Sequence, residues 1–170
     1  MAEPWLRGPI ADMPAMVMPA AHALMQAAED IPRAAAGLTN AQLWALPGGA
    51  AAVGFHLRHL GGSIDRLLTY MRGEMLTDAQ MAALDAEIED DGRSSNELVR
   101  EALAAIERGI EAMRDTPPGI YLEPRGVGRR RLPTTVFGLL VHIAEHTQRH
   151  VGAIIATAKV VRVMSETRSA

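Results

Sequence analysis

Residues 94–115 read SSNELVREALAAIERGIEAMRD, and this stretch decides the fold. Apolar side chains return at three- and four-residue steps, which places them on one face of a helix: Leu98, Ala102, Ile106, Ile110 and Met113. Ser94 or Ser95 is a typical helix N-cap, and Pro-Pro-Gly at 117–119 closes the segment. A long helix with one apolar face is typical of a helical bundle.

Three more stretches have this character, at about residues 14–36, 50–72 and 133–163, so the sequence predicts four long helices. Pro32 lies inside the first of them and should kink or divide it, because proline lacks the amide donor. Shorter helical turns are expected at 39–44 and 77–88. Residues 120–132 alternate weakly and contain glycines, which favours a long loop or a small hairpin before the last helix.

The composition favours an all-α protein. Apolar residues make up 48% of the chain but aromatic residues only 4%, and Ala, Leu and Met are better suited to helices than to sheets. A length of 170 residues fits one domain with its own core, so residues 1–170 are expected to form a single domain. We therefore expect a four-helix bundle with additional short helices.

Charge and hydropathy argue against several classes of function. The net charge is −3 and the only basic cluster, at 129–131, is typical of a solvated loop, so no nucleic acid partner is expected. Apolar runs end well before the roughly 20 residues of a membrane span. Prolines at positions 9, 14 and 19 interrupt the run that a signal peptide would need. We expect a cytoplasmic protein with no membrane partner.

The last helix carries half of the six histidines, and the chain has no cysteine, so any metal must be held by His, Asp or Glu. His142, His146 and His150 follow one another at four-residue steps on one helical face. The outer two lie about 12 Å apart along the axis, too far for one ion at about 2.1 Å per bond. One ion can therefore use His142 with His146, or His146 with His150.

A third protein ligand should come from another helix, since catalytic metal sites usually have three. The candidates are His56 and His59 on the second long helix. The apolar stripe of that helix runs beside His56, and His59 lies about 60° further round at 100° per residue. Periodicity alone thus favours His56.

These histidine motifs resemble those of the DinB-like superfamily of four-helix bundles, which also includes the YfiT-type proteins. The resemblance rests on His59-Leu60-Gly61-Gly62-Ser63 and on the His146-x-x-x-His150 pair with Gly152 after it, and it extends over nearly the whole chain. In that family one histidine of the second helix and the HxxxH pair of the last helix bind the metal. The resemblance therefore implies His59, His146 and His150 as metal ligands.

One departure from the family concerns the end of the last motif. Many members read His-Arg-Gly-Gln, whereas this chain reads His150-Val151-Gly152-Ala153 and so loses both polar residues. Members include thiol S-transferases that use bacillithiol and an isomerase that uses mycothiol. The resemblance thus implies a metal-dependent transferase or hydrolase that acts with a low-molecular-weight thiol or another small molecule.

The chemistry expected is that of one divalent ion, zinc or nickel, in a neutral shell. Three imidazoles leave the charge of the ion unquenched, which lowers the pKa of a bound water or thiol. His56, His142, Asp65 and Arg66 are candidates for alternative ligands or for contacts just behind the ligands.

The competing hypothesis is a non-catalytic metal-binding or structural module, or a homodimer formed through Met-rich helix faces. A structural ion would have four protein ligands, and His22 or His142 would then supply the fourth.

Overall fold

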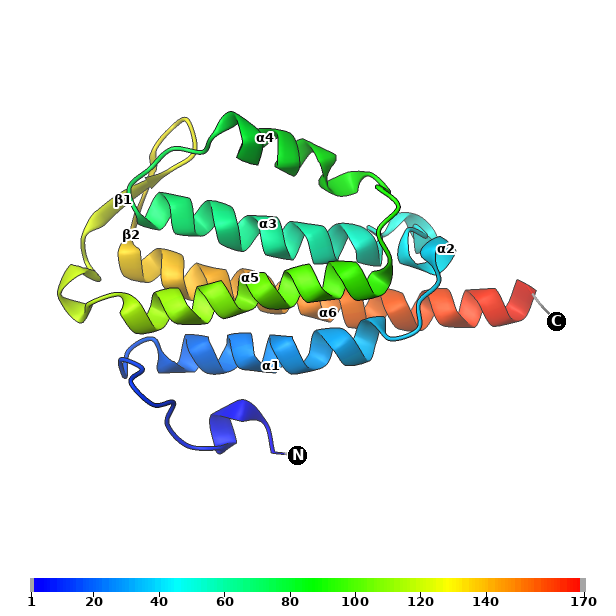
Figure 1. Cartoon of the computed structure of the whole chain (residues 1–170), viewed down its shortest axis with the longest axis horizontal. Helices are drawn as coiled ribbons and strands as arrows, with labels where there is room; N and C mark the ends of the chain where they lie inside the picture. The colour runs from blue at the N-terminus through cyan, green and yellow to red at the C-terminus, as the bar shows by residue number, and fades with distance from the viewer. Residues whose placement is uncertain (1, 169–170) are drawn as a thin grey trace.

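Four long helices form the body of the protein. The computed structural model describes residues 2–168 and contains α1 (Met18–Ala35), α3 (Val53–Met71), α5 (Ser95–Asp115) and α6 (Val136–Arg168). Figure 1 shows α1 and α6 running in one direction and α3 and α5 in the other. α1 and α3 each pack against both α5 and α6. The pair α3 and α6 carries five of the six histidines. The predicted all-α bundle is confirmed.

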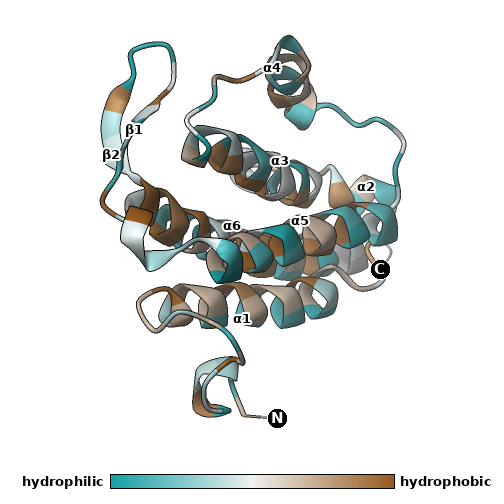
Figure 2. Ribbon diagram, turned by 60° about the vertical axis from the view of Figure 1, so that its left-hand side comes forward, coloured by the Kyte–Doolittle hydropathy of each residue, from teal (hydrophilic) through white to brown (hydrophobic). Residues whose placement is uncertain are grey.

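Shorter elements connect these helices: α2 (Asn40–Leu43), α4 (Asp78–Asp85) and the 3₁₀ turns η1 (Pro4–Leu6), η2 (Pro47–Gly49), η3 (Ala86–Ile88) and η4 (Pro118–Ile120). Figure 2 shows α4 outside the four-helix core, beside α3. The expected hairpin is present as the antiparallel strands β1 (Pro124–Val127) and β2 (Leu132–Thr135). α4 carries the chain back along α3, which lets α5 run parallel to α3 (Figure 1).

Two local expectations differ from the structure. Pro32 does not divide α1, because Ile31 and Ala35 on either side of it are buried in the core and hold the helix in place. The last helix begins at Val136 rather than at Pro133, because residues 132–135 pair with β1 as a strand.

The core is a continuous cluster of aliphatic side chains from the four long helices. Those with almost no exposure include Leu24, Ile31, Leu57, Leu60, Ile64, Leu98, Ile106, Met113, Leu140, Ile143 and Ile154. Burying one such side chain stabilises the fold by about 1.5–3 kcal/mol, so this cluster is the main source of stability. None of the described helices is both long and apolar enough to cross a membrane.

Candidate metal centre

Three histidine rings converge where α3 packs against α6. One ring nitrogen from each of His59, His146 and His150 lies within 4.8 Å of the others. The Nε2 atoms of His59 and His146 are 3.1 Å apart, and the ring centroid of His150 is 4.6 Å from that of His59 and 4.5 Å from that of His146. Ligands about 2.1 Å from a tetrahedral ion are about 3.4 Å from one another, so this cluster has the size that a single ion requires.

The helices place these rings at the border between core and solvent. His146 and His150 are one turn apart on α6, beside the buried Ile143 and Val151. Both rings are half-buried, and the His59 side chain is 20% exposed. The cluster is thus shielded by the bundle but not sealed from solvent.

His56 lies behind His150 and outside this cluster. Its Nδ1 is 2.9 Å from Nδ1 of His150, so one ring donates its N–H to the other. His59 is therefore the α3 histidine whose ring nitrogen groups with those of both His146 and His150, whereas His56, which periodicity favours, contacts His150. The reason is that α3 packs against both α5 and α6, so its apolar stripe does not point at α6 alone.

A buried carboxylate supports His59 from the other side. Glu87 of η3 is only 3% exposed, and its Oε2 lies 2.7 Å from Nδ1 of His59. Its Oε1 accepts a hydrogen bond of 2.6 Å from Nη1 of Arg66. Burial raises the pKa of Glu87, but the hydrogen bonds from His59 and Arg66 and the charge of Arg66 outweigh it and hold that pKa below its ordinary value. Glu87 is therefore ionised at neutral pH.

The other candidates on α3 act through neighbours. Arg66 is buried and reaches the histidines through Glu87. Asp65 is exposed and accepts a hydrogen bond of 2.7 Å from Nε2 of Gln80 on α4. Asp65 therefore fastens α4 to α3.

Two further histidines occupy other places. His142 is exposed on α6, with Nδ1 3.2 Å from Oε2 of Glu145, and its ring centroid is 5.4 Å from that of His146. His22 on α1 has Nε2 3.2 Å from the carbonyl oxygen of Gly8 and fastens the N-terminal segment to α1. Among the described residues, His56 is thus better placed than either of them to become a fourth ligand.

Burial favours the neutral form of three of the histidines on α3 and α6. Burial, helped by repulsion from the neighbouring histidines, lowers the pKa of His146 to about 4 and that of His150 to about 3. Burial also lowers the pKa of His56. Rings that are neutral at pH 7 offer lone pairs to a cation without first losing a proton.

An aromatic wall completes the α3 side of the site. The ring of Phe55 stacks on that of His59, with centroids 5.3 Å apart and an interplanar angle of 22°. It also meets the ring of His56 edge-on at 5.2 Å. Phe55 thus gives the site an apolar surface beside the histidines.

The contact with Arg149 favours a tautomer of His146 that cannot bind an ion through Nε2. Its Nη2 is 3.3 Å from Nδ1 of His146, and its Nε pairs with Oε1 of Glu145 at 2.7 Å. A guanidinium has only donors, so this contact uses Nδ1 of His146 as the acceptor and leaves the ring proton on Nε2. An ion on Nε2 requires the other tautomer, and Arg149 must then turn away.

A helical bundle with a three-histidine cluster between two of its helices defines a class of protein equipped to hold a metal ion. The family model of the DinB superfamily matches residues 23–154, which include all the clustered histidines. The chain belongs to the DinB superfamily. A comparison with curated proteins finds no match.

Two residues at the site were missed by reasoning from the sequence. Glu87 is one of five acidic residues in the stretch 85–91 (DAEIEDD), and no periodicity separates it from the others. Phe55 lies one position before His56 and is one of only two phenylalanines in the chain, which is the only signal that could have drawn attention to it.

Proposed function

We propose that the protein binds one divalent metal ion, zinc or nickel, through His59, His146 and His150 and uses it in catalysis. The observation that carries the proposal is the convergence of three half-buried imidazoles from two helices, with one ring nitrogen of each within 4.8 Å of the others. Imidazole nitrogens are suitable ligands for zinc and nickel. α3 and α6 hold these rings in place at the border between core and solvent.

The surroundings of the rings suit a small polar substrate. A bound ion in a neutral shell would lower the pKa of a thiol or water molecule toward neutrality. Phe55 covers one face of the His59 ring and would offer an apolar surface to the substrate. Arg149, which is largely exposed at the rim, offers donors to an anionic group once it leaves His146.

The reaction class we propose is thiol transfer, with hydrolysis as the nearest alternative. Membership of the DinB superfamily supports this choice. The substrate would be a low-molecular-weight thiol with its acceptor, and the site of action the cytoplasm. A homodimer is part of the same proposal, since methionine-rich helix faces pack readily against a second copy.

The position of His56 supports a second candidate function. Its Nδ1 is close to His150, so a modest ring movement would bring a fourth imidazole to the cluster. Four protein ligands are typical of a structural site, in which the ion would only tie α3 to α6.

Elemental analysis of the untagged protein tests the first proposal, with His146→Ala beside His142→Ala as a matched control on the same helix. We expect about one equivalent of metal in the wild type and in His142→Ala, and none in His146→Ala. Absence of metal from the wild-type protein after incubation with zinc and nickel would contradict the proposal.

Cobalt substitution separates catalysis from a structural role. In an open site, an added thiol replaces a solvent ligand and produces a sulfur-to-cobalt charge-transfer band. A cobalt spectrum that does not respond to thiol, together with a response in His56→Ala, would favour the structural role.

A further inference from the structure

The segment between α3 and α5 is fastened along α3 at its beginning. Gln80 of α4 donates hydrogen bonds to Oδ2 of Asp65 at 2.7 Å and to Oγ1 of Thr69 at 2.8 Å. Thr77 and Gln80 also form the capping box that begins α4. The start of this segment therefore has a fixed register against α3.

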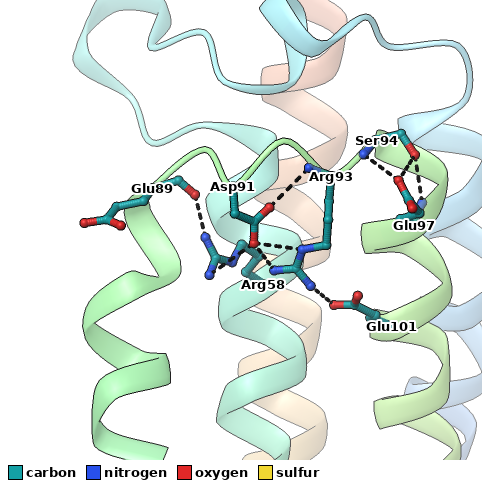
Figure 3. Close-up of polar contacts among 7 residues, drawn as sticks. All are labelled: Arg58, Glu89, Asp91, Arg93, Ser94, Glu97 and Glu101. Carbon is teal, nitrogen blue, oxygen red and sulfur yellow. Dashed lines mark hydrogen bonds and ion pairs between the residues drawn. The ribbon is translucent and has the colours of Figure 1, made fainter.

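The same segment is fastened again at its end, where Figure 3 shows the contacts. Arg58 of α3 donates to the carbonyl oxygen of Glu89 at 2.5 Å and lies 3.5 Å from Oδ2 of Asp91. Arg93 binds the same Asp91 oxygen at 2.5 Å through Nη2 and forms an ion pair with Glu101 of α5. Two arginines thus tie this end to both α3 and α5.

Glu87 lies between these two attachments and points into the bundle. Burying a carboxylate costs free energy unless it is paired, and here each of its oxygens has its own partner, His59 and Arg66. Gly62 on α3 leaves the space that these groups occupy, because a Cβ there would lie 2.7 Å from Nη1 of Arg66 and closer still to Oε1 of Glu87. The segment and the glycine together present one charged carboxylate to one histidine.

We propose that Glu87 is a positioning residue for the metal site. By accepting the Nδ1 proton of His59 it selects the tautomer in which Nε2 carries a lone pair, and it holds that nitrogen 3.1 Å from Nε2 of His146. Arg66 keeps Glu87 in its place through the 2.6 Å hydrogen bond to Oε1. This inference rests on the proposed metal site. Loss of such a partner typically weakens metal binding by about 10–100-fold.

If the Arg66–Glu87 pair only stabilised the fold, replacing it would change stability and not zinc affinity. A double variant separates this structural role from a positioning role. Arg66→Met with Glu87→Met replaces the buried pair by apolar side chains of similar length, a change that is often neutral or stabilising. It leaves Nδ1 of His59 without its acceptor. We therefore expect a melting temperature at or above that of the wild type together with zinc binding about 10–100-fold weaker.

The experiment measures the zinc dissociation constant of each metal-free protein by competition with a chromophoric chelator. Glu89→Gln is the matched control, because Glu89 is exposed on the same segment and uses its backbone carbonyl, not its carboxylate, to bind Arg58. It should bind zinc like the wild type. Cobalt spectra recorded in parallel should change in the double variant and not in the control, since the orientation of the His59 ring affects the ligand field.

The zinc affinities separate the positioning role of Glu87 from the proposed metal site itself. Zinc binding by the double variant within threefold of the wild type would overturn the positioning role and leave the metal site intact. Failure of the wild type to bind zinc would overturn the proposed function, and the positioning role with it.

Discussion

Replacing Gly62 by alanine should weaken metal binding without unfolding the protein. The new Cβ would lie 2.7 Å from Nη1 of Arg66 and nearer to Oε1 of Glu87, whereas ordinary van der Waals contact begins at about 3.4 Å. Both atoms belong to the far ends of flexible side chains, so they move rather than the backbone. Oε1 of Glu87 is the nearer atom and must retreat by about 1 Å, and a shift of this size would lengthen the 2.7 Å contact between Glu87 and His59 beyond hydrogen-bonding distance.

The expected loss is about tenfold in the zinc association constant, which corresponds to about 1.4 kcal/mol. Gly61→Ala is the matched control, because its Cβ would meet only ordinary contacts, the nearest at 3.8 Å from Cβ of Ala105. Both substitutions replace a glycine inside α3, and alanine is favoured there by up to about 1 kcal/mol.

The assay is chelator competition for zinc, with urea unfolding of the metal-free proteins beside it. Gly61→Ala should be at least as stable as the wild type and bind zinc equally well. Gly62→Ala should bind more weakly at little cost in stability. Equal zinc affinities for the two variants would show that the placement of Glu87 does not matter to the binding of zinc by His59.

Three further predictions concern the pKa values of the clustered histidines, the contact of Arg149 and the packing of the core. The free energy of unfolding of the metal-free protein should fall as the pH falls from about 6.5 toward 4. In the folded state the pKa values of His146 and His150 are lowered to about 4 and about 3, so these rings stay neutral. In the unfolded chain the same rings take up protons near pH 6.5. Urea titrations across this range should show a shallower slope for His150→Gln, and an equal slope would contradict the assigned cause. Arg149→Gln should raise zinc affinity a few-fold, since a glutamine oxygen can accept the Nδ1 proton that metal binding places on His146. An unchanged or lower affinity, measured with a competing chelator, would show that Arg149 does not oppose zinc binding. Ile143→Ala, at a fully buried core position, should lower the free energy of unfolding by about 2–5 kcal/mol, whereas Val141→Ala on the exposed face of α6 should change it by about 0.5 kcal/mol or less; similar losses in urea unfolding would contradict the assigned packing.

Helix positions could be predicted from the sequence because they depend on local signals. The apolar stripe of 94–115, the caps at Ser94 and Thr77 and the hairpin before α6 all lie within a few residues of the groups that cause them. The start of α6 was placed too early, because Pro133 fits either the first turn of a helix or a strand, and only pairing with β1 decides between them.

The arrangement of the site depended on contacts between distant elements. Spacing alone placed His142, His146 and His150 on one face of a single helix and left either neighbour as the partner of His146, and the family resemblance selected His150. The choice between His56 and His59 depends on how α3 is rotated against α6, and periodicity does not decide it because α3 faces two neighbours; the structure groups His59 with His146 and His150. Glu87 could not be found at all, because its position depends on the path of a polar connection that Arg58, Asp65 and Gly62 of α3 fix in place.

The most direct test of the central claim is anomalous diffraction, recorded at the zinc absorption edge from crystals of the zinc-loaded protein. We expect one anomalous peak per chain, within bonding distance of a ring nitrogen of each of His59, His146 and His150, while Nδ1 of His59 keeps its contact with Glu87. A peak at any other place, or one that touches His56 in place of His59, would contradict this expectation.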